Sequence, residues 1–72
     1  MTKAEERARR MIAGLSTERL LEQWELTTDN NDENIYTVRG WLMDEIERRY
    51  PEAFEKWLDE DAEDENLRKY IA

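Results

Sequence analysis

Apolar side chains recur every three or four residues along most of the chain, and this spacing limits the possible folds more than any other feature. Ala4, Ala8, Met11 and Leu15 begin the pattern, which places such residues on one face of an α-helix. No run of alternating polarity is long enough for a strand. We therefore expect an all-α fold, a small bundle of three to four helices with a short C-terminal helical turn, forming one domain over residues 1–72. The expected helices span residues 3–13, 17–27, 35–49, 52–58 and 65–71.

Capping residues mark where the expected helices begin and end. Thr2 and Glu5 fit the capping-box pattern of a helix start, and Ser16 is a favourable N-cap for the second helix. Gly14 offers the left-handed residue that commonly ends a helix. Pro51 suits the first turn of a new helix, where its missing N–H is no loss. Residues 28–34 are polar throughout, so we expect a loop there.

Aromatic rings supply most of the material for a core. A chain of 72 residues without cysteine or histidine has no disulfide and no histidine-bound metal to stabilise it, so apolar packing must do so. Trp24 and Trp57 lie on the apolar stripes of their helices and are expected in the core. Trp41 lies beside the stripe of the third helix. We expect it to widen the buried face, and the alternative is a position at the rim as an anchor for a partner protein.

Gly40 directly precedes Trp41 inside an expected helix. A glycine in a helix interior costs about 1 kcal/mol relative to alanine. Its missing side chain allows another segment to approach the backbone closely. We expect the chain's own first or second helix to fill that space and receive the ring of Trp41, with a partner protein as the alternative.

The residue pattern does not predict catalysis or a bound metal. The acidic segments that begin at Asp29 and at Asp59 both lack the glycine and the glutamate that an EF-hand calcium loop requires at its sixth and twelfth positions. The chain has no histidine to activate a serine and no glycine-rich phosphate loop. With nineteen acidic residues, the closeness of two carboxylates carries little information. We expect a protein that is not an enzyme and uses no cofactor or metal.

The net charge of −8 is unevenly distributed. Residues 1–19 carry five basic and three acidic side chains, whereas residues 20–72 carry six basic and sixteen acidic ones. This balance disfavours binding to nucleic acid or to anionic membranes, and direct binding of DNA through the N-terminal arginines is the least favoured alternative. We expect a cytoplasmic protein, since no stretch reads as a membrane span or a secretory signal. The basic N-terminal helix is attracted to the acidic remainder, within one molecule or between two copies.

The segment from Tyr36 to Asp59 resembles part of a group of small, uncharacterised acidic helical proteins encoded on phages and conjugative elements of intestinal Firmicutes. The similarity is strongest over TVRGWLMDE, residues 37–45, and over PEAF, residues 51–54. It extends over roughly residues 16–71. The resemblance implies a mobile-element setting and assigns no activity or functional residue.

Two functions follow from these features, and both are non-catalytic protein binding. In the first, the chain mimics nucleic acid and occupies a basic groove of a host defence or regulatory protein. The carboxylates that would do so are Asp29, Asp32, Glu33, Asp59, Glu60, Asp61, Glu63, Asp64 and Glu65. In the second, the chain is a small helical adaptor or a homodimer that uses an aromatic face around Trp41 and Tyr36. A globular domain without any mimicry remains the third alternative.

Overall fold

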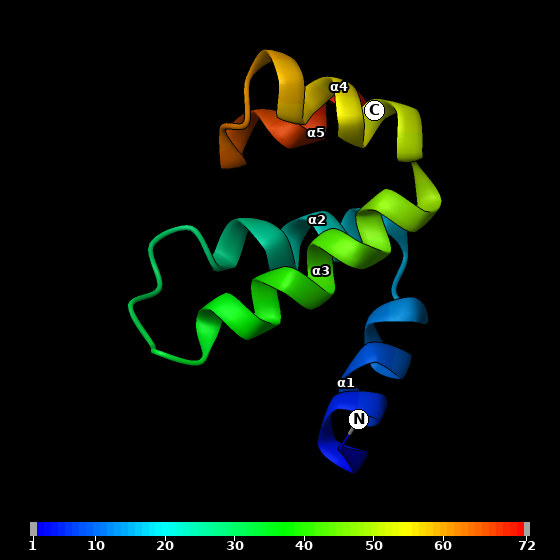
Figure 1. Ribbon diagram of the computed structural model, residues 1–72, viewed down its shortest axis with the longest axis vertical. Coiled ribbons are helices and arrows are strands. Elements are labelled where there is room, and N and C mark those ends of the chain that lie inside the picture. The colour runs from blue at the N-terminus through cyan, green and yellow to red at the C-terminus, as the bar shows by residue number, and fades with distance from the viewer. Residues whose placement is uncertain (1, 72) are drawn as a thin grey trace.

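Five α-helices and one 3-10 turn make up most of residues 2–71, the part of the chain that the computed structural model describes (Figure 1). The fold class is therefore all-α, as expected, and residues 2–71 contain no strand. The expected helices agree with the observed ones to within a residue or two at most ends. The elements are α1 (Lys3–Ala13), α2 (Thr17–Leu26), α3 (Ile35–Arg49), α4 (Pro51–Glu60), the 3-10 turn η1 (Asp64–Asn66) and α5 (Leu67–Ile71).

The starts of α1 and α2 carry the side-chain caps predicted from the sequence, although the Glu5 carboxylate of the expected capping box pairs with Arg9 instead. The Thr2 hydroxyl accepts a hydrogen bond from the Glu5 N–H at 3.1 Å, and the Ser16 hydroxyl accepts one from the Arg19 N–H at 3.2 Å. Each bond satisfies a donor that the helix itself leaves free. Pro51 occupies the first position of α4, where its ring suits the helix.

The prediction for Gly14 is wrong, because this residue has a right-handed conformation with φ −85°. A left-handed ending normally provides donors for the last carbonyl groups of a helix. Here the guanidinium of Arg49 does so from another helix. Its Nη2 donates to the carbonyls of Ile12, Ala13 and Leu15 at 3.3, 3.1 and 2.6 Å. The end of α1 is thus capped from outside, so no left-handed residue is needed.

The core lies between the pair α2 and α3 and the C-terminal helices. Figure 1 shows α2 and α3 side by side, with α4 and α5 along one side of the pair and α1 projecting from the other. The rings of Trp24 and Trp57 meet edge to face, with centroids 6.0 Å apart, as predicted for two core tryptophans. The fully or nearly fully buried apolar residues are Leu20, Leu21, Trp24, Leu42, Ile46, Phe54, Trp57 and Leu67.

Hydrogen bonds from the buried indoles of Trp24 and Trp57 hold the acidic segment after α4 against this core. Trp57 Nε1 donates to the Glu63 carbonyl at 2.8 Å, and Trp24 Nε1 donates to the Asp64 carbonyl at 3.2 Å. These bonds direct the chain back across the core, so that Leu67 is fully buried. The C-terminal helix therefore docks on the body of the protein. No helix within residues 2–71 is long and apolar enough to cross a membrane.

Candidate functional site

Helix α1 leaves much of its apolar stripe uncovered. It is the one helix of residues 2–71 that contains no buried residue. Ile12 packs against the core from the last turn of α1, and Leu15 does so just beyond it. Met11 is 70% exposed, and Ala4 is exposed as well. An amphipathic helix normally buries such a stripe, whereas here most of this face of α1 is exposed.

Charged contacts with α3 set the position of α1. Arg9 Nη1 lies 3.0 Å from Asp44 Oδ2, and Arg9 Nε lies 3.1 Å from Glu5 Oε2. The Asp44 and Glu5 carboxylates raise the pKa of Arg9, so it stays charged. Together with the cap from Arg49, these contacts join α1 to the C-terminal half of α3. Toward its N-terminus α1 extends away from the body (Figure 1).

A groove of about 560 Å³ lies where α1, α2 and α3 meet. We call it the α1–α3 groove. Trp41 lines it, is half-buried, and is not among the residues packed against the core. Of the two alternatives for Trp41, the rim position is therefore the one observed. The lining is mostly apolar and consists of Ala8, Arg10, Met11, Ile12, Gly14, Leu15, Gln23, Thr27, Val38, Trp41 and Leu42.

The expectation that the first or second helix fills the space at Gly40 is wrong. A Cβ atom placed on Gly40 would meet nothing within 4 Å. The physical reason is the face of α3 on which Gly40 lies, because at 3.6 residues per turn it points about 160° away from Val38, which lines the groove. The backbone at Gly40 therefore lies open on the side of α3 that α1 and α2 do not cover. Tyr36, the other aromatic residue of the proposed face, is 79% exposed and does not line the groove.

A basic edge flanks the open part of α1. At 3.6 residues per turn, Lys3, Arg7 and Arg10 lie on the side of the stripe next to Met11, whereas Arg9 lies on the side that faces α3. Arg10 also lines the groove. Within residues 2–71 none of Lys3, Arg7 and Arg10 forms an ion pair. These three cations are the basic edge.

The acidic residues singled out from the sequence differ in whether other side chains hold them; within residues 2–71, Asp32 accepts a hydrogen bond only from the backbone N–H of Asn34, at 2.9 Å. The Asp61 carboxylate accepts hydrogen bonds from Asn66 Nδ2 at 2.9 and 3.2 Å. Asp64 pairs with Arg39 at 2.9 Å. These two carboxylates therefore stabilise the fold. Those that are exposed and take part in no ion pair within residues 2–71 are Asp29, Asp32, Glu33, Asp59, Glu60, Glu63 and Glu65.

A row of carboxylates on the outer face of α4 was missed by the sequence reasoning. Glu52, Glu55 and Asp59 lie on one face, and together with Glu60 and Lys56 they line a shallow hollow of about 330 Å³. The spacing of three and four residues was visible in the sequence. The denser acidic run over residues 59–65 follows directly and makes this spacing inconspicuous in the sequence.

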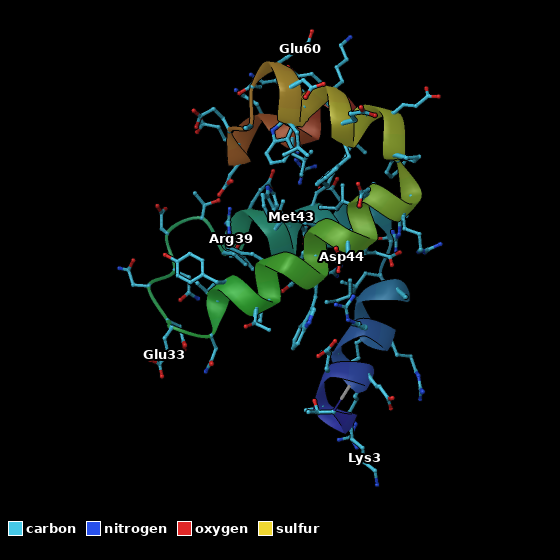
Figure 2. The ribbon with its side chains drawn as sticks, viewed as in Figure 1. Lys3, Glu33, Arg39, Met43, Asp44 and Glu60 are labelled. Carbon is cyan, nitrogen blue, oxygen red and sulfur yellow. The ribbon has the colours of Figure 1, made fainter. Side chains whose placement is uncertain are left out.

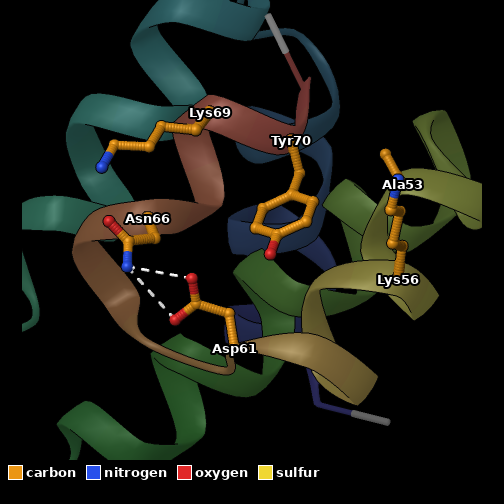
Figure 3. Close-up of a pocket in the computed structure, with 6 residues that line it drawn as sticks. All are labelled: Ala53, Lys56, Asp61, Asn66, Lys69 and Tyr70. Carbon is orange, nitrogen blue, oxygen red and sulfur yellow. Dashed lines mark hydrogen bonds between the residues drawn. The ribbon is translucent and has the colours of Figure 1, made fainter.

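A second hollow, of about 440 Å³, lies between α4 and α5. Figure 3 shows Asp61 and Asn66 pointing toward each other, with Lys56 and Lys69 on different sides of the hollow. Burial, with the nearby charges of Asp61 and Glu60, raises the pKa of Tyr70. The hydrogen bonds from Asn66 engage the Asp61 carboxylate in holding the segment between α4 and α5.

The most buried carboxylate is Glu45, whose side chain is 9% exposed. Hydrogen bonds from Arg48 and Arg49 hold its pKa below the usual range, although burial acts in the opposite direction. A general acid requires a raised pKa, so Glu45 is suited to an ion pair. No group of three or more potential metal ligands occurs within residues 2–71.

Comparisons with protein-family models, with curated proteins and with solved structures found no match to this chain.

Proposed function

We propose that this chain is a non-catalytic protein-binding module, and that its binding surface is the α1–α3 groove. The observation that carries the proposal is the half-buried Trp41 in an apolar groove whose other wall is the uncovered stripe of α1. Tryptophan is among the residues that contribute most to binding energy at protein interfaces. A groove between helices accepts an amphipathic segment of another chain, whose apolar face fills it.

The charges around the groove specify the chemistry of that partner segment. Arg7 and Arg10 stand beside the open stripe without an ion-pair partner within the described residues. We infer that the partner presents apolar side chains toward Trp41 and carboxylates toward the basic edge. Such complementary charges fix the register of the contact and speed the encounter.

The test compares two substitutions at equally exposed apolar residues. Met11 lines the groove and Leu26 does not, and both are 70% exposed. The wild-type chain, Met11→Glu and Leu26→Glu would each be used to capture proteins from the native host, followed by identification and a binding curve with the purified partner. A partner that binds the wild type and Leu26→Glu equally, and Met11→Glu at least about tenfold more weakly, supports the proposal. Equal binding to all three variants contradicts it.

Nucleic-acid mimicry is the second candidate, and the row on α4 favours it. Glu52, Glu55 and Asp59 follow one another at about one helical turn, with about 5 to 6 Å between Cβ atoms. They would attract a groove lined by lysine and arginine. The mimic surface would lie on the outer face of α4 more than on residues 59–65. The reason is that Asp61 is hydrogen-bonded by Asn66 and Asp64 is paired with Arg39. It also fits the mobile-element setting that the resemblance implies.

Salt and competition separate this candidate from groove binding. The mimic is expected to bind a basic protein in a manner that DNA competes with and that weakens as salt rises. Glu55→Gln with Asp59→Asn should weaken this binding, and Met11→Glu should leave it unchanged. If a basic partner protein binds the variant Glu55→Gln with Asp59→Asn as tightly as the wild type, nucleic-acid mimicry by α4 is excluded.

A further inference from the structure

We propose that the occupant of the α1–α3 groove is a second copy of this chain, docked about a two-fold axis that passes through the groove. This inference rests on the proposed function, because it identifies the partner of the same surface. The basic edge of each copy would then meet the loop between α2 and α3 of the other copy. Asp29, Asp32 and Glu33 are the carboxylates of this loop, which we call the acidic loop.

The first argument is the position of the two charged clusters relative to the groove. Thr27 and Val38 line the groove, and the acidic loop lies in the chain between them. The basic edge flanks the opposite wall, α1. Figure 2 shows Lys3 at the free end of α1 and Glu33 on the outer side of the loop, well separated from each other. The groove therefore has a positive wall and a negative end.

In a two-fold dimer, the basic edge and the acidic loop, which lie apart in one copy, can each contact the opposite charge on the other copy. In an isologous contact both copies use the same patch. The α1 wall of one groove can therefore face the acidic-loop end of the other groove. The basic edge of one copy would lie against the acidic loop of the other, twice per dimer. Within a single copy Arg9 makes the one ion pair between α1 and another helix of residues 2–71. The other cations of α1 thus have their complement on a second molecule.

The second argument is the incomplete burial of α1. This helix has 11 residues and none of them is buried, whereas isolated helices below about 12 to 15 residues are marginal in water. A domain of this size buries a smaller share of its surface than a larger one does. Covering Ala8 and Met11 with a second copy would remove apolar area from water, which stabilises both chains.

The third argument is the fit between Met11 and the surface around Trp41. Met11 is 70% exposed, and its flexible thioether packs favourably at aromatic ring edges. In the dimer, Met11 of one copy would lie against the ring of Trp41 in the groove of the other copy.

Sedimentation equilibrium from about 1 μM to about 1 mM measures the association directly. The wild-type chain is expected to be a reversible dimer. Met11→Glu should raise the dimer dissociation constant at least about tenfold, and so should the paired reversal Arg7→Glu with Arg10→Glu. Leu26→Glu and the reversal Glu55→Lys with Asp59→Lys on α4 are matched controls, which should dimerise as the wild type does. Circular dichroism and urea unfolding check that every variant is folded.

Mixing two reversed variants gives the most specific result. Arg7→Glu with Arg10→Glu in one chain, and Asp29→Lys with Glu33→Lys in the other, should each remain monomeric alone. Because both contacts across the axis of the mixed dimer would join opposite charges, one in the native sense and one reversed, the mixture should associate more tightly than either variant. A wild-type monomer at about 1 mM, or a dimer insensitive to Met11→Glu and both reversals, overturns the inference.

The claim that a second copy fills the groove can fail while the claim that the groove binds a protein still holds. If the chain is monomeric but a different protein binds it in a manner that Met11→Glu abolishes, the groove is a binding surface and the second copy is not its occupant. If neither association depends on Met11, the proposed function itself is wrong.

Discussion

Arg49 is held by Glu45 one helical turn before it, with 2.6 Å between Arg49 Nε and Glu45 Oε2. The same guanidinium donates to three carbonyls at and just beyond the end of α1. The pair therefore fixes the position of the helix that forms one wall of the groove. Both side chains are mostly shielded from water, with 15% and 9% exposed, so solvent screens the contact little.

Replacing Arg49 with lysine should loosen α1 specifically. An ammonium group cannot bind Glu45 and the carbonyl groups of α1 in the planar geometry of a guanidinium. We expect Arg49→Lys to lower the free energy of unfolding by about 2 kcal/mol. Hydrogen exchange should become faster in α1 and remain slow in α2. Arg48→Lys is the matched control, because Arg48 is 65% exposed and its loss should cost less than about 1 kcal/mol. Equal effects of the two substitutions would contradict this role.

Acid should destabilise the protein through Glu45. The pKa of Glu45 is lower in the folded chain than its ordinary value of 4.5, because of hydrogen bonds from Arg48 and Arg49. A carboxyl group with a lowered folded pKa stabilises the fold above its ordinary pKa, and this stability is lost as pH falls through the folded pKa. Urea unfolding from pH 7 to pH 3 should show a fall in the unfolding free energy that begins near pH 5. Glu45→Gln should be less stable at pH 7 and should show a smaller fall.

Gly40→Ala should stabilise the single chain. A Cβ at this position meets nothing within 4 Å, and alanine is favoured over glycine in a helix by about 0.5 to 1 kcal/mol. Thermal or urea unfolding at a concentration where the chain is monomeric measures this gain. The same substitution should leave dimerisation unchanged, because Gly40 does not line the α1–α3 groove. Loss of stability in the monomer would mean that a segment of the chain itself covers Gly40.

Trp57→Phe should release the acidic segment after α4. It removes the donor to the Glu63 carbonyl, and the smaller ring leaves a gap in the core. We expect a loss of about 1 to 3 kcal/mol in unfolding free energy. Cleavage by a glutamate-specific protease at Glu63 and Glu65 should become faster under native conditions. Trp41→Phe, at the rim, should leave this cleavage rate unchanged. An equal rate in both variants would show that the indole does not fasten this segment.

The helices could be predicted from the sequence because their signals are local. These signals are the spacing of apolar residues, the N-caps Thr2 and Ser16, and Pro51 at the start of α4. Each acts within one or two helical turns. The core positions of Trp24 and Trp57 follow from the same stripes, and so does the docking of Leu67. Local rules also place Ala4, Ala8 and Met11 on one face of α1, but they do not state whether another part of the chain covers that face.

What the sequence could not reveal depends on contacts between distant residues. Arg49 caps α1 across more than thirty residues of chain, and with the backbone N–H groups of Gly14 and Leu15 it satisfies the last carbonyls of α1 without a left-handed residue. The pairing of Asp64 with Arg39 removed one carboxylate from the candidate mimic surface. Neither partner is indicated by spacing, because many arginines and carboxylates in this chain are equally available.

The central claim, that a protein covers the groove around Trp41, is tested most directly by fluorine NMR of the chain labelled with 5-fluorotryptophan. The three tryptophans give three signals, and Trp41→Phe assigns the one from the groove. Raising the protein concentration, or adding a captured partner, should shift the Trp41 signal and leave those of the buried Trp24 and Trp57 in place. The shift should be absent in Met11→Glu and present in Leu26→Glu. A Trp41 signal that stays constant up to about 1 mM protein and in the presence of every captured partner would contradict the account.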